Sequence, residues 1–349
     1  MSGTPQPGST PADRTPPASH QSGAPPLPPR SEPRLARLVT TRDLTDQQLR
    51  WLLRTGEALA AGADRAEATR RRLLGRTVVL AFFENSTRTR VSFELAAKRL
   101  GADTLNLDIA HSSVAKGESL IDTVATLDAM DPDAMIVRHG LPSAARIAAR
   151  HARAPVINAG SGVRAHPTQA LLDALTLLRI AGPRLGRTLD PDAERPLDGL
   201  RIAIVGDIVR SRVARSNIAL FRRLGADLTL VGPEAFLPRR FAQLGVRTAW
   251  SLEEGLTPPP HVVYALRVQH ERETRSGAPD VDEYRAAFGI TEAVLRRFCR
   301  DALVMHPGPV NRGIELSPDI ADGERSLILD QVRHGVAMRM AILLAMLED

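Results

Sequence analysis

A run of hydroxyl and guanidinium side chains follows a short apolar segment at residues 77–83. Residues 86–90 read Ser-Thr-Arg-Thr-Arg and stand where a helical pattern begins. A helix N-terminus carries unpaired N–H groups and a partial positive charge, so hydroxyls and an arginine added there form a cradle for phosphate. A Ser or Thr helix cap with solvated arginines is the alternative, and this pentapeptide alone leaves it open.

Three further strand ends carry polar side chains where apolar ones would cost less to bury. They are Arg138-His139, residues 158–160 (Asn-Ala-Gly) leading to 166–169 (His-Pro-Thr-Gln), and residues 306–309 (His-Pro-Gly-Pro). Ligands of open parallel sheets bind beyond the carboxyl ends of the strands, so these groups can converge on the cradle. Singly, a His before Pro is commonly a turn residue, and Arg138 could form a surface ion pair. Together they favour one anion-binding site.

The elements that must hold these residues alternate between strand-like and helical segments. Short β-rich runs lie at 77–83, 104–108, 134–138 and 156–159, and in a second series at 201–205, 227–231, 262–266 and 302–305. Helical patterns such as 91–100, 120–130, 168–180 and 213–224 stand between them. This β-α-β order predicts parallel sheets. We therefore expect an α/β protein of two parallel-sheet domains joined by helices, with the active site between them.

Composition sets the expected domain boundaries. Ten of the 26 prolines precede Leu35, and such a segment lacks the apolar residues that offset chain ordering, so residues 1–33 are expected to be a disordered tail. A transit peptide is disfavoured because prolines prevent its amphipathic helix. We expect a first domain at 34–182, a second at 183–328, and a C-terminal helix at 329–349 that packs back on the first.

Charge and composition narrow the function classes. The chain has 349 residues, 43% of them hydrophobic, with no run long enough to span a membrane and no signal-peptide pattern. Its single cysteine, Cys299, fits a reducing compartment, so cytoplasm is the expected location. The net charge is +6, but Lys98 and Lys116 are the only lysines, and the arginines are interleaved with acids. With 3% aromatic residues, a nucleic-acid surface is not expected.

The motifs together resemble the aspartate/ornithine carbamoyltransferase superfamily, and within it the catalytic chains of aspartate carbamoyltransferases. The resemblance runs from about residue 38 to the C-terminus and rests on seven motifs in the same order. They are 86–90, 113–118 (Ser-Val-Ala-Lys-Gly-Glu), 137–139 (Val-Arg-His), 166–169, 206–207 (Gly-Asp) with 211–213 (Ser-Arg-Val), 267–269 (Arg-Val-Gln) and 306–309.

The resemblance implies transfer of the carbamoyl group of carbamoyl phosphate to the amine of L-aspartate, in pyrimidine (UMP) biosynthesis. The implied carbamoyl phosphate site comprises Ser86, Thr87, Arg88, Thr89, Arg138, His166, Gln169 and the backbone of Gly308 and Pro309. The implied L-aspartate site comprises Lys116, Arg212, Arg267 and Gln269. Arg88, Thr89, Arg138 and His166 are the implied catalytic residues, and neither a metal nor a cofactor is implied.

The same resemblance implies a homotrimer. Lys116, with Ser113, is similar to a mobile loop that enters the neighbouring subunit's active site in this family. Whether the trimer joins regulatory or dihydroorotase-type partner chains stays open, and neither a nucleic acid nor a membrane is an expected partner.

Elementary chemistry agrees with this expectation. Carbamoyl phosphate is a dianion and aspartate a dicarboxylate, so the site must neutralise about four negative charges with cations on a fixed scaffold. The neutral aspartate amine would attack the carbamoyl carbon directly. His166 would act as a positioned hydrogen-bond donor, and the departing phosphate would take the amine proton. No enzyme nucleophile is then required.

Departures and competing interpretations are few. Ser161 stands where an aspartate is frequent, the Lys116 loop is one residue shorter than in some members, and Gly308 replaces a bulkier residue found in some members.

The nearest competing interpretation is an ornithine carbamoyltransferase. Those enzymes typically have cysteine in the motifs that here read His-Pro-Thr-Gln and His-Pro-Gly-Pro, and Cys299 lies outside both, which favours aspartate. A dinucleotide-binding dehydrogenase is disfavoured because the Gly-x-Gly-x-x-Gly pattern is missing after Gly206. A non-catalytic scaffold with a partner-recruiting tail is the remaining alternative.

Overall fold

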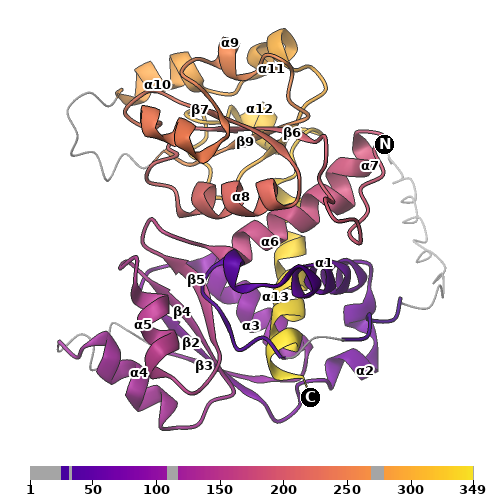
Figure 1. Ribbon diagram of the computed structural model, residues 1–349, viewed down its shortest axis with the longest axis vertical. Coiled ribbons are helices and arrows are strands. Elements are labelled where there is room, and N and C mark those ends of the chain that lie inside the picture. The colour runs from indigo at the N-terminus through magenta and orange to yellow at the C-terminus, as the bar shows by residue number, and fades with distance from the viewer. Residues whose placement is uncertain (1–24, 31–33, 108–116, 269–278, 349) are drawn as a thin grey trace, which may run out of the picture.

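Two five-stranded sheets, one in each of two units stacked along the long axis, form the frame of the molecule (Figure 1). The structure is a computed structural model that describes residues 25–30, 34–107, 117–268 and 279–348. All strand pairings within both sheets are parallel. This confirms the predicted architecture of two parallel-sheet α/β units.

The first sheet has the strand order β1-β5-β4-β2-β3. Its strands are β1 (Arg37–Leu38), β2 (Thr77–Phe82), β3 (Asp103–Asn106), β4 (Ala134–His139) and β5 (Val156–Ser161). The three central strands are β5, β4 and β2, and the apolar residues of β2 and β5 are buried. Continuous apolar runs are what a sheet covered on both faces requires.

The second sheet has the order β10-β9-β6-β7-β8. Its strands are β6 (Arg201–Val205), β7 (Asp227–Val231), β8 (Arg247–Ala249), β9 (Val262–Ala265) and β10 (Leu303–Met305). The sequence did not predict β1 or β8. Both stand at sheet edges and are two and three residues long, too short for a hydrophobic period to show.

Helices cover both sheets. Those of the first unit are α1 (Asp46–Ala60), α2 (Glu67–Arg70), α3 (Thr87–Arg99), α4 (Leu120–Asp128), α5 (Ala144–His151) and α6 (Pro167–Thr176). A π-helical segment, Leu177–Ala181, continues α6 into α7 (Gly182–Arg184). Those of the second unit are α8 (Arg212–Arg223), α9 (Leu252–Gly255), α10 (Val281–Phe288), α11 (Glu292–Phe298) and α12 (Pro318–Asp322). Short 3-10 turns lie at Thr41–Asp43, Ala63–Arg65 and Arg239–Leu244.

The last helix, α13 (Ile328–Leu347), returns from the second unit to the first (Figure 1). It packs against α1, α3 and α6. A helix that is apolar all round belongs in a core rather than at a surface, and nearly every side chain of the last three turns of α13 is buried. The helix therefore ties the end of the chain to the middle of the first unit.

Residues 25–30 lie against the first unit, although we expected them to belong to a disordered tail. Leu27 packs on the hydrophobic core. The Trp51 Nε1–H donates to the Pro28 carbonyl at 3.3 Å, and the Arg30 guanidinium donates to the Glu348 carbonyl at 2.9 Å. The segment thus has apolar and hydrogen-bonding partners on α1 and at the end of α13, which the composition of the tail did not indicate.

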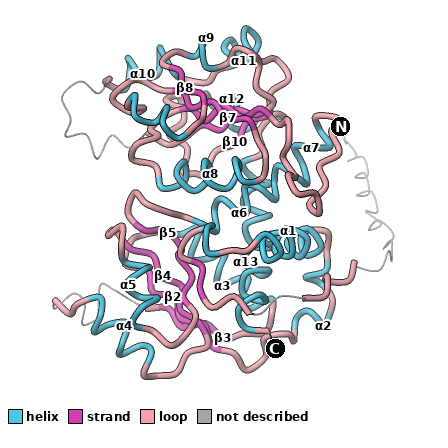
Figure 2. The backbone as a smooth tube through the Cα atoms, in the orientation of Figure 1, coloured by secondary structure: helices cyan, strands magenta, loops and turns pink. Residues whose placement is uncertain are grey.

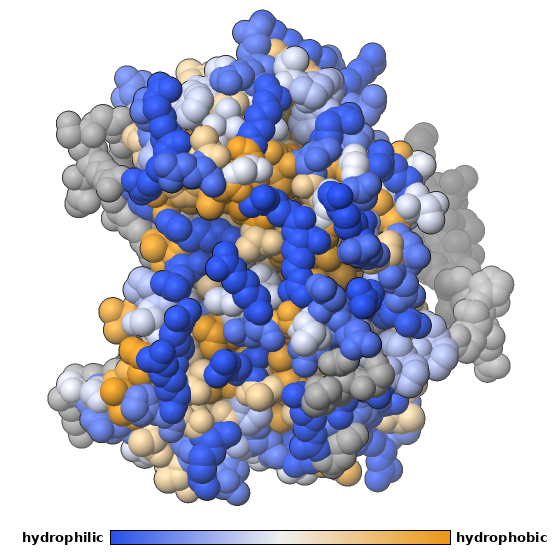
Figure 3. Space-filling model, viewed as in Figure 1, coloured by the Kyte–Doolittle hydropathy of each residue, from blue (hydrophilic) through white to orange (hydrophobic). Residues whose placement is uncertain are grey.

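The two units face each other across a recess. Loops gather there on the side where the first-sheet strands end (Figure 2), and the space-filling view shows hydrophilic side chains on both of its walls (Figure 3). Within the described residues, no helix is both long and apolar enough to cross a membrane.

Candidate active site

The phosphate cradle lies at the start of α3. Strand β2 ends at Phe82, and Ser86 is the N-cap residue of α3 but makes no side-chain capping hydrogen bond within the described chain. The helix-cap interpretation is therefore not supported, and the first N–H groups of α3 stay available to an anion. Thr87 is the first helical residue, and Thr89 is buried in the first turn.

Arg138 stands at the carboxyl end of β4, with most of its side chain buried. Its Nη1–H donates to the Ala159 carbonyl at 3.0 Å, which anchors the guanidinium next to the end of β5. Burial, then the nearby guanidinium of Arg212, lowers the pKa of Arg138 to about 10. The group stays charged at neutral pH, but its positive charge is poorly compensated, which favours an incoming anion.

Arg212, the first residue of α8, reaches across from the second unit. Its Nη1–H donates to Glu84 Oε2 at 2.8 Å, and the same carboxylate oxygen lies 3.6 Å from Nε of Arg138. Glu84 follows β2 and precedes the cradle. One carboxylate thus joins arginines from both units, and it does so where the strands of the first sheet end.

Two glycines show how closely the arginines approach the backbone. A Cβ on Gly160, whose φ is +126°, would lie 2.9 Å from Arg138 Nη1 and 3.3 Å from Arg212 Cζ. A Cβ on Gly308, whose φ is +65°, would lie 3.0 Å from Arg88 Cζ. Arg88, on the first unit, therefore packs against the turn at residues 306–309 of the second.

Arg267 follows β9 and completes the group of cations. Partial burial, then repulsion from Arg267, lowers the pKa of Arg88, and Arg88 in turn contributes to lowering the pKa of Arg138. Arginines at 88, 138, 212 and 267 thus share one electrostatic environment. Lys116, Ser113 and Gln269 lie outside the described residues.

His166 is the N-cap residue of α6 and is buried. Burial, followed by repulsion from Arg138, Arg212 and Arg339, holds its pKa well below the usual value. The imidazole is consequently neutral at physiological pH and can donate one hydrogen bond. The Thr168 hydroxyl lies 3.4 Å from Nδ1; a hydroxyl that donates there leaves the ring proton on Nε2. The backbone N–H of His166 donates to Ser216 Oγ of α8 at 2.9 Å.

The turn at 306–309 is held by its own histidine. The N–H of Gly308 donates to His306 Nδ1 at 2.8 Å, so the ring proton lies on Nε2, 3.2 Å from Glu315 Oε1. Burial is the main cause that lowers the pKa of His306. Nδ1 accepts from the turn itself and Nε2 faces Glu315, so His306 shapes the turn that carries Gly308 and Pro309.

Gln169, also buried, uses its amide to donate to Asp173 Oδ1 at 2.9 Å, one turn further along α6. Sequence reasoning overlooked both Glu84 and Asp173. The available signal for Asp173 was a carboxylate inside an otherwise apolar helix, four residues after Gln169. Glu84 stood within the run 82–90 but was not assigned a role.

No group of three or more His, Cys, Asp and Glu side chains among the described residues could hold a metal ion. The chemical character of the site is instead that of several guanidiniums, a neutral imidazole and a helix N-terminus brought together where the two units meet. Fold and site together define an α/β protein of two parallel-sheet units with a cationic site where the units meet, a site suited to anionic ligands.

Comparisons with known proteins identify the family. The model of the aspartate/ornithine carbamoyltransferase carbamoyl-P binding domain matches residues 37–179, and that of the Asp/Orn binding domain matches residues 198–346. The chain belongs to the aspartate/ornithine carbamoyltransferase family.

Curated relatives and solved structures agree. The chain is 47% identical, over 309 residues, to the aspartate carbamoyltransferase catalytic subunit of Methylorubrum populi, covering 88% of this chain and 94% of the relative. Aspartate transcarbamoylase from Trypanosoma cruzi with carbamoyl aspartate and phosphate has a TM-score of 0.78 at 32% identity, covering 92% and 98% of the two chains. The catalytic subunit of M. jannaschii aspartate transcarbamoylase has a TM-score of 0.74 at 30% identity, covering 89% of this chain and 97% of that one.

Proposed function

We propose that this protein is an aspartate carbamoyltransferase that converts carbamoyl phosphate and L-aspartate to N-carbamoyl-L-aspartate and phosphate in pyrimidine biosynthesis. The observation that carries the proposal is the meeting of Arg138 from the first unit with Arg212 from the second around Glu84 and Gly160. Arg88 is near enough to contribute to lowering the pKa of Arg138. Such a cluster of desolvated cations is suited to two polyanionic reactants and would be costly without them.

The first unit is proposed to bind carbamoyl phosphate. The open N-terminus of α3, with Ser86, Thr87 and Arg88, would hold the phosphate. Thr89, Arg138, His166 and Gln169 would surround the carbamoyl group, and the backbone of Gly308 and Pro309 would hold its amide. The pKa values of Arg88 and Arg138, both lowered by burial, support the binding of an anion beside them.

The second unit is proposed to bind L-aspartate. Arg212 and Arg267 would grip its carboxylates, together with Gln269 and with Lys116 of a neighbouring subunit. A pocket lined by arginines suits a dicarboxylate and disfavours the cationic side chain of ornithine. This is the reason to prefer aspartate as the acceptor.

In the proposed reaction, the neutral amine of aspartate attacks the carbamoyl carbon. The C–N bond forms, the carbonyl oxygen gains negative charge, and the C–O bond to phosphate then breaks. Arg88, Thr89 and His166 would donate to that oxygen, and each well-placed donor is worth about 3–4 kcal/mol. Phosphate leaves with the electron pair and takes the amine proton. Alignment of the two reactants contributes roughly 7–11 kcal/mol more.

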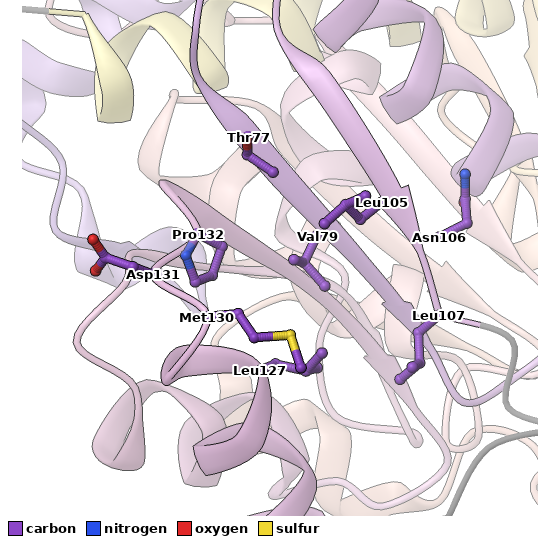
Figure 4. Close-up of a pocket in the computed structure, with 9 residues that line it drawn as sticks. All are labelled: Thr77, Val79, Leu105, Asn106, Leu107, Leu127, Met130, Asp131 and Pro132. Atoms are coloured by element: carbon purple, nitrogen blue, oxygen red, sulfur yellow. The ribbon is translucent and has the colours of Figure 1, made fainter.

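We further propose a homotrimer with shared active sites. Strand β3 is an edge strand, and its Leu105 is 55% exposed, while the neighbouring Met130 is 69% exposed. These side chains line a cavity of about 310 Å³ together with Val79, Leu107 and Leu127 (Figure 4). An open edge with apolar side chains is suited to a subunit contact. Leu107 is also the last described residue before the segment that contains Lys116.

A cytoplasmic location completes the proposal, and the one cysteine, buried Cys299, fits that reducing compartment. The deciding experiment measures phosphate release from carbamoyl phosphate by the purified protein with either L-aspartate or L-ornithine, while the mass in solution is measured in parallel. Release that depends on aspartate by a particle of three chains is expected. Dependence on ornithine, or no turnover by a folded trimer, would refute the assignment.

A further inference from the structure

A buried carboxylate lies between the two units, hydrogen-bonded to Gln169 of the proposed carbamoyl phosphate site. Asp173 of α6 is completely inaccessible to solvent. Its Oδ1 accepts from Gln169 Nε2 at 2.9 Å and from Gln331 Nε2 at 2.7 Å, and its Oδ2 accepts from Asn217 Nδ2 at 3.0 Å and from the Tyr264 hydroxyl at 2.7 Å. The donors come from α6, α13, α8 and β9, so four elements meet at one side chain.

The network is costly to keep, which argues that it serves a purpose beyond packing. Burial raises the pKa of Asp173 to about 6, even though four hydrogen bonds oppose the shift. The ionised carboxylate accepts only, so all four donors are satisfied together when it is charged, as at neutral pH. Replacing such a buried charged network by apolar side chains is often neutral or stabilising, so stability alone does not explain it.

What the network fixes is the orientation of an amide. Because Nε2 of Gln169 donates to Asp173, the Oε1 atom of the same amide points away from that carboxylate and accepts no hydrogen bond from the part of the chain that the structure describes. The carbamoyl group of the proposed substrate carries an NH₂, which needs an acceptor. A flipped amide would present a second donor to that NH₂ and lose the contact.

Gln331, the second donor to Oδ1 of Asp173, connects this carboxylate to the turn at residues 306–309. Gln331 donates to Asp173 with Nε2, and its Oε1 accepts from the backbone N–H of His306 at 3.0 Å. His306 begins the turn whose Gly308 and Pro309 backbone is proposed to hold the carbamoyl amide. A single carboxylate oxygen is thus connected to the two groups proposed to recognise that NH₂.

We propose that Asp173 is a positioning residue for carbamoyl recognition, which holds the Gln169 amide so that its oxygen accepts from the NH₂ of carbamoyl phosphate. The inference rests on the proposed function, because it takes carbamoyl phosphate as the occupant of the pocket. Asp173 itself does not touch the substrate and acts through Gln169.

Acetyl phosphate provides the discriminating probe, since a methyl group replaces the NH₂ and cannot use the Gln169 oxygen. In Asp173→Asn, the new NH₂ faces one pair of donors, so the network cannot form as before. We expect this variant to raise the KM for carbamoyl phosphate at least about tenfold. The inhibition constant of acetyl phosphate, measured as a competitive inhibitor, should rise less than about threefold. Gln169→Ala should show the same pattern, and the double variant should be no worse than Gln169→Ala.

Tyr264→Phe is the matched control, because it removes a donor to Oδ2 and leaves both Oδ1 contacts intact. It should change the KM for carbamoyl phosphate by less than about threefold, whatever its effect on the unfolding temperature. Asp173→Ser is made in parallel, since its smaller side chain leaves room for a water molecule if Asp173→Asn does not fold.

An equal loss of affinity for carbamoyl phosphate and for acetyl phosphate would overturn the inference, because a merely structural defect weakens the binding of both. So would additive effects of the Asp173 and Gln169 substitutions. Turnover by the unsubstituted protein tests the proposed function separately: its absence would refute that function, whereas a normal wild-type enzyme with an unselective Asp173 variant would refute only the positioning role.

Discussion

Arg212 of the second unit donates a 2.8 Å hydrogen bond to Glu84 of the first. This contact, with Nε of Arg138 3.6 Å from the same carboxylate oxygen, is a direct polar link between the units at the proposed site. All three side chains are mostly buried. The link therefore combines two tasks, holding the units together and fixing the guanidinium that is proposed to bind aspartate.

Glu84→Ala is expected to raise the KM for aspartate and lower kcat, by about tenfold or more in kcat/KM, because Arg212 loses the partner that orients it. Steady-state kinetics with aspartate as the varied substrate measures the effect. Glu84→Gln is the matched control, since its amide oxygen can still accept from Arg212, and it should retain more activity than the alanine variant. Equal losses in both variants, or none in either, would contradict this role.

Replacing His166 by Ala should lower kcat far more than it weakens phosphate binding. The neutral imidazole is proposed to donate to the carbonyl oxygen as charge develops there, and removal of one such donor costs about 10²–10³ in turnover. Rate measurements at saturating substrates and phosphate inhibition constants separate the two quantities. An unchanged kcat would exclude His166 from this position.

How far the sequence predicts such a site can be seen by comparing Arg138 with Glu84. Arg138 is predictable because a charged residue that ends an apolar run implies a strand end, and the ends of parallel strands converge. The role of Glu84 depends on its hydrogen bond with Arg212, which is far away in the chain. No local sequence pattern predicts that contact. The same holds for Asp173, whose donors on β9 and α13 come together only after the two units have docked.

A similar distinction applies to the fold. The buried strands β2, β4, β5, β6 and β9 are predicted from continuous apolar runs. The predicted helix at 168–180 exists, but its last part is the π-helical segment Leu177–Ala181. The short edge strands β1 and β8 depend on a neighbouring strand for their conformation, so tertiary contact rather than local sequence decides them.

Gly160→Ala is expected to abolish most of the activity. The new Cβ would lie 2.9 Å from Arg138 Nη1 and 3.3 Å from Arg212 Nε, so at least one guanidinium must move. We expect kcat/KM to fall by about a hundredfold, since misplacement of a substrate-positioning group by about 1 Å has effects of that size. Steady-state kinetics of the folded variant provides the measurement.

Gly186→Ala separates this displacement from backbone strain. Gly186 also has a positive φ, +65°, but a Cβ there would meet nothing within 4 Å. Both variants should lose roughly 1–2 kcal/mol of stability, and only Gly160→Ala should lose activity. Comparable activity in the two variants would mean that Arg138 and Arg212 do not depend on the space above Gly160.

Finally, the stability of the protein should fall in mild acid, partly through His334 of α13. Burial, with repulsion from Arg179, lowers the pKa of His334 to about 4, and its Nδ1 lies 2.9 Å from the Thr176 hydroxyl. Because the unfolded chain binds the proton more tightly, this histidine costs stability as the pH falls below its usual value of 6.5. Between pH 7 and pH 5, His334 is expected to lower the free energy of unfolding by about 2 kcal/mol.

Urea unfolding at both pH values should show this loss in the unsubstituted protein and a smaller one in His334→Gln, whose amide cannot be protonated in this range. The same pH dependence in both would show that the buried imidazole does not contribute.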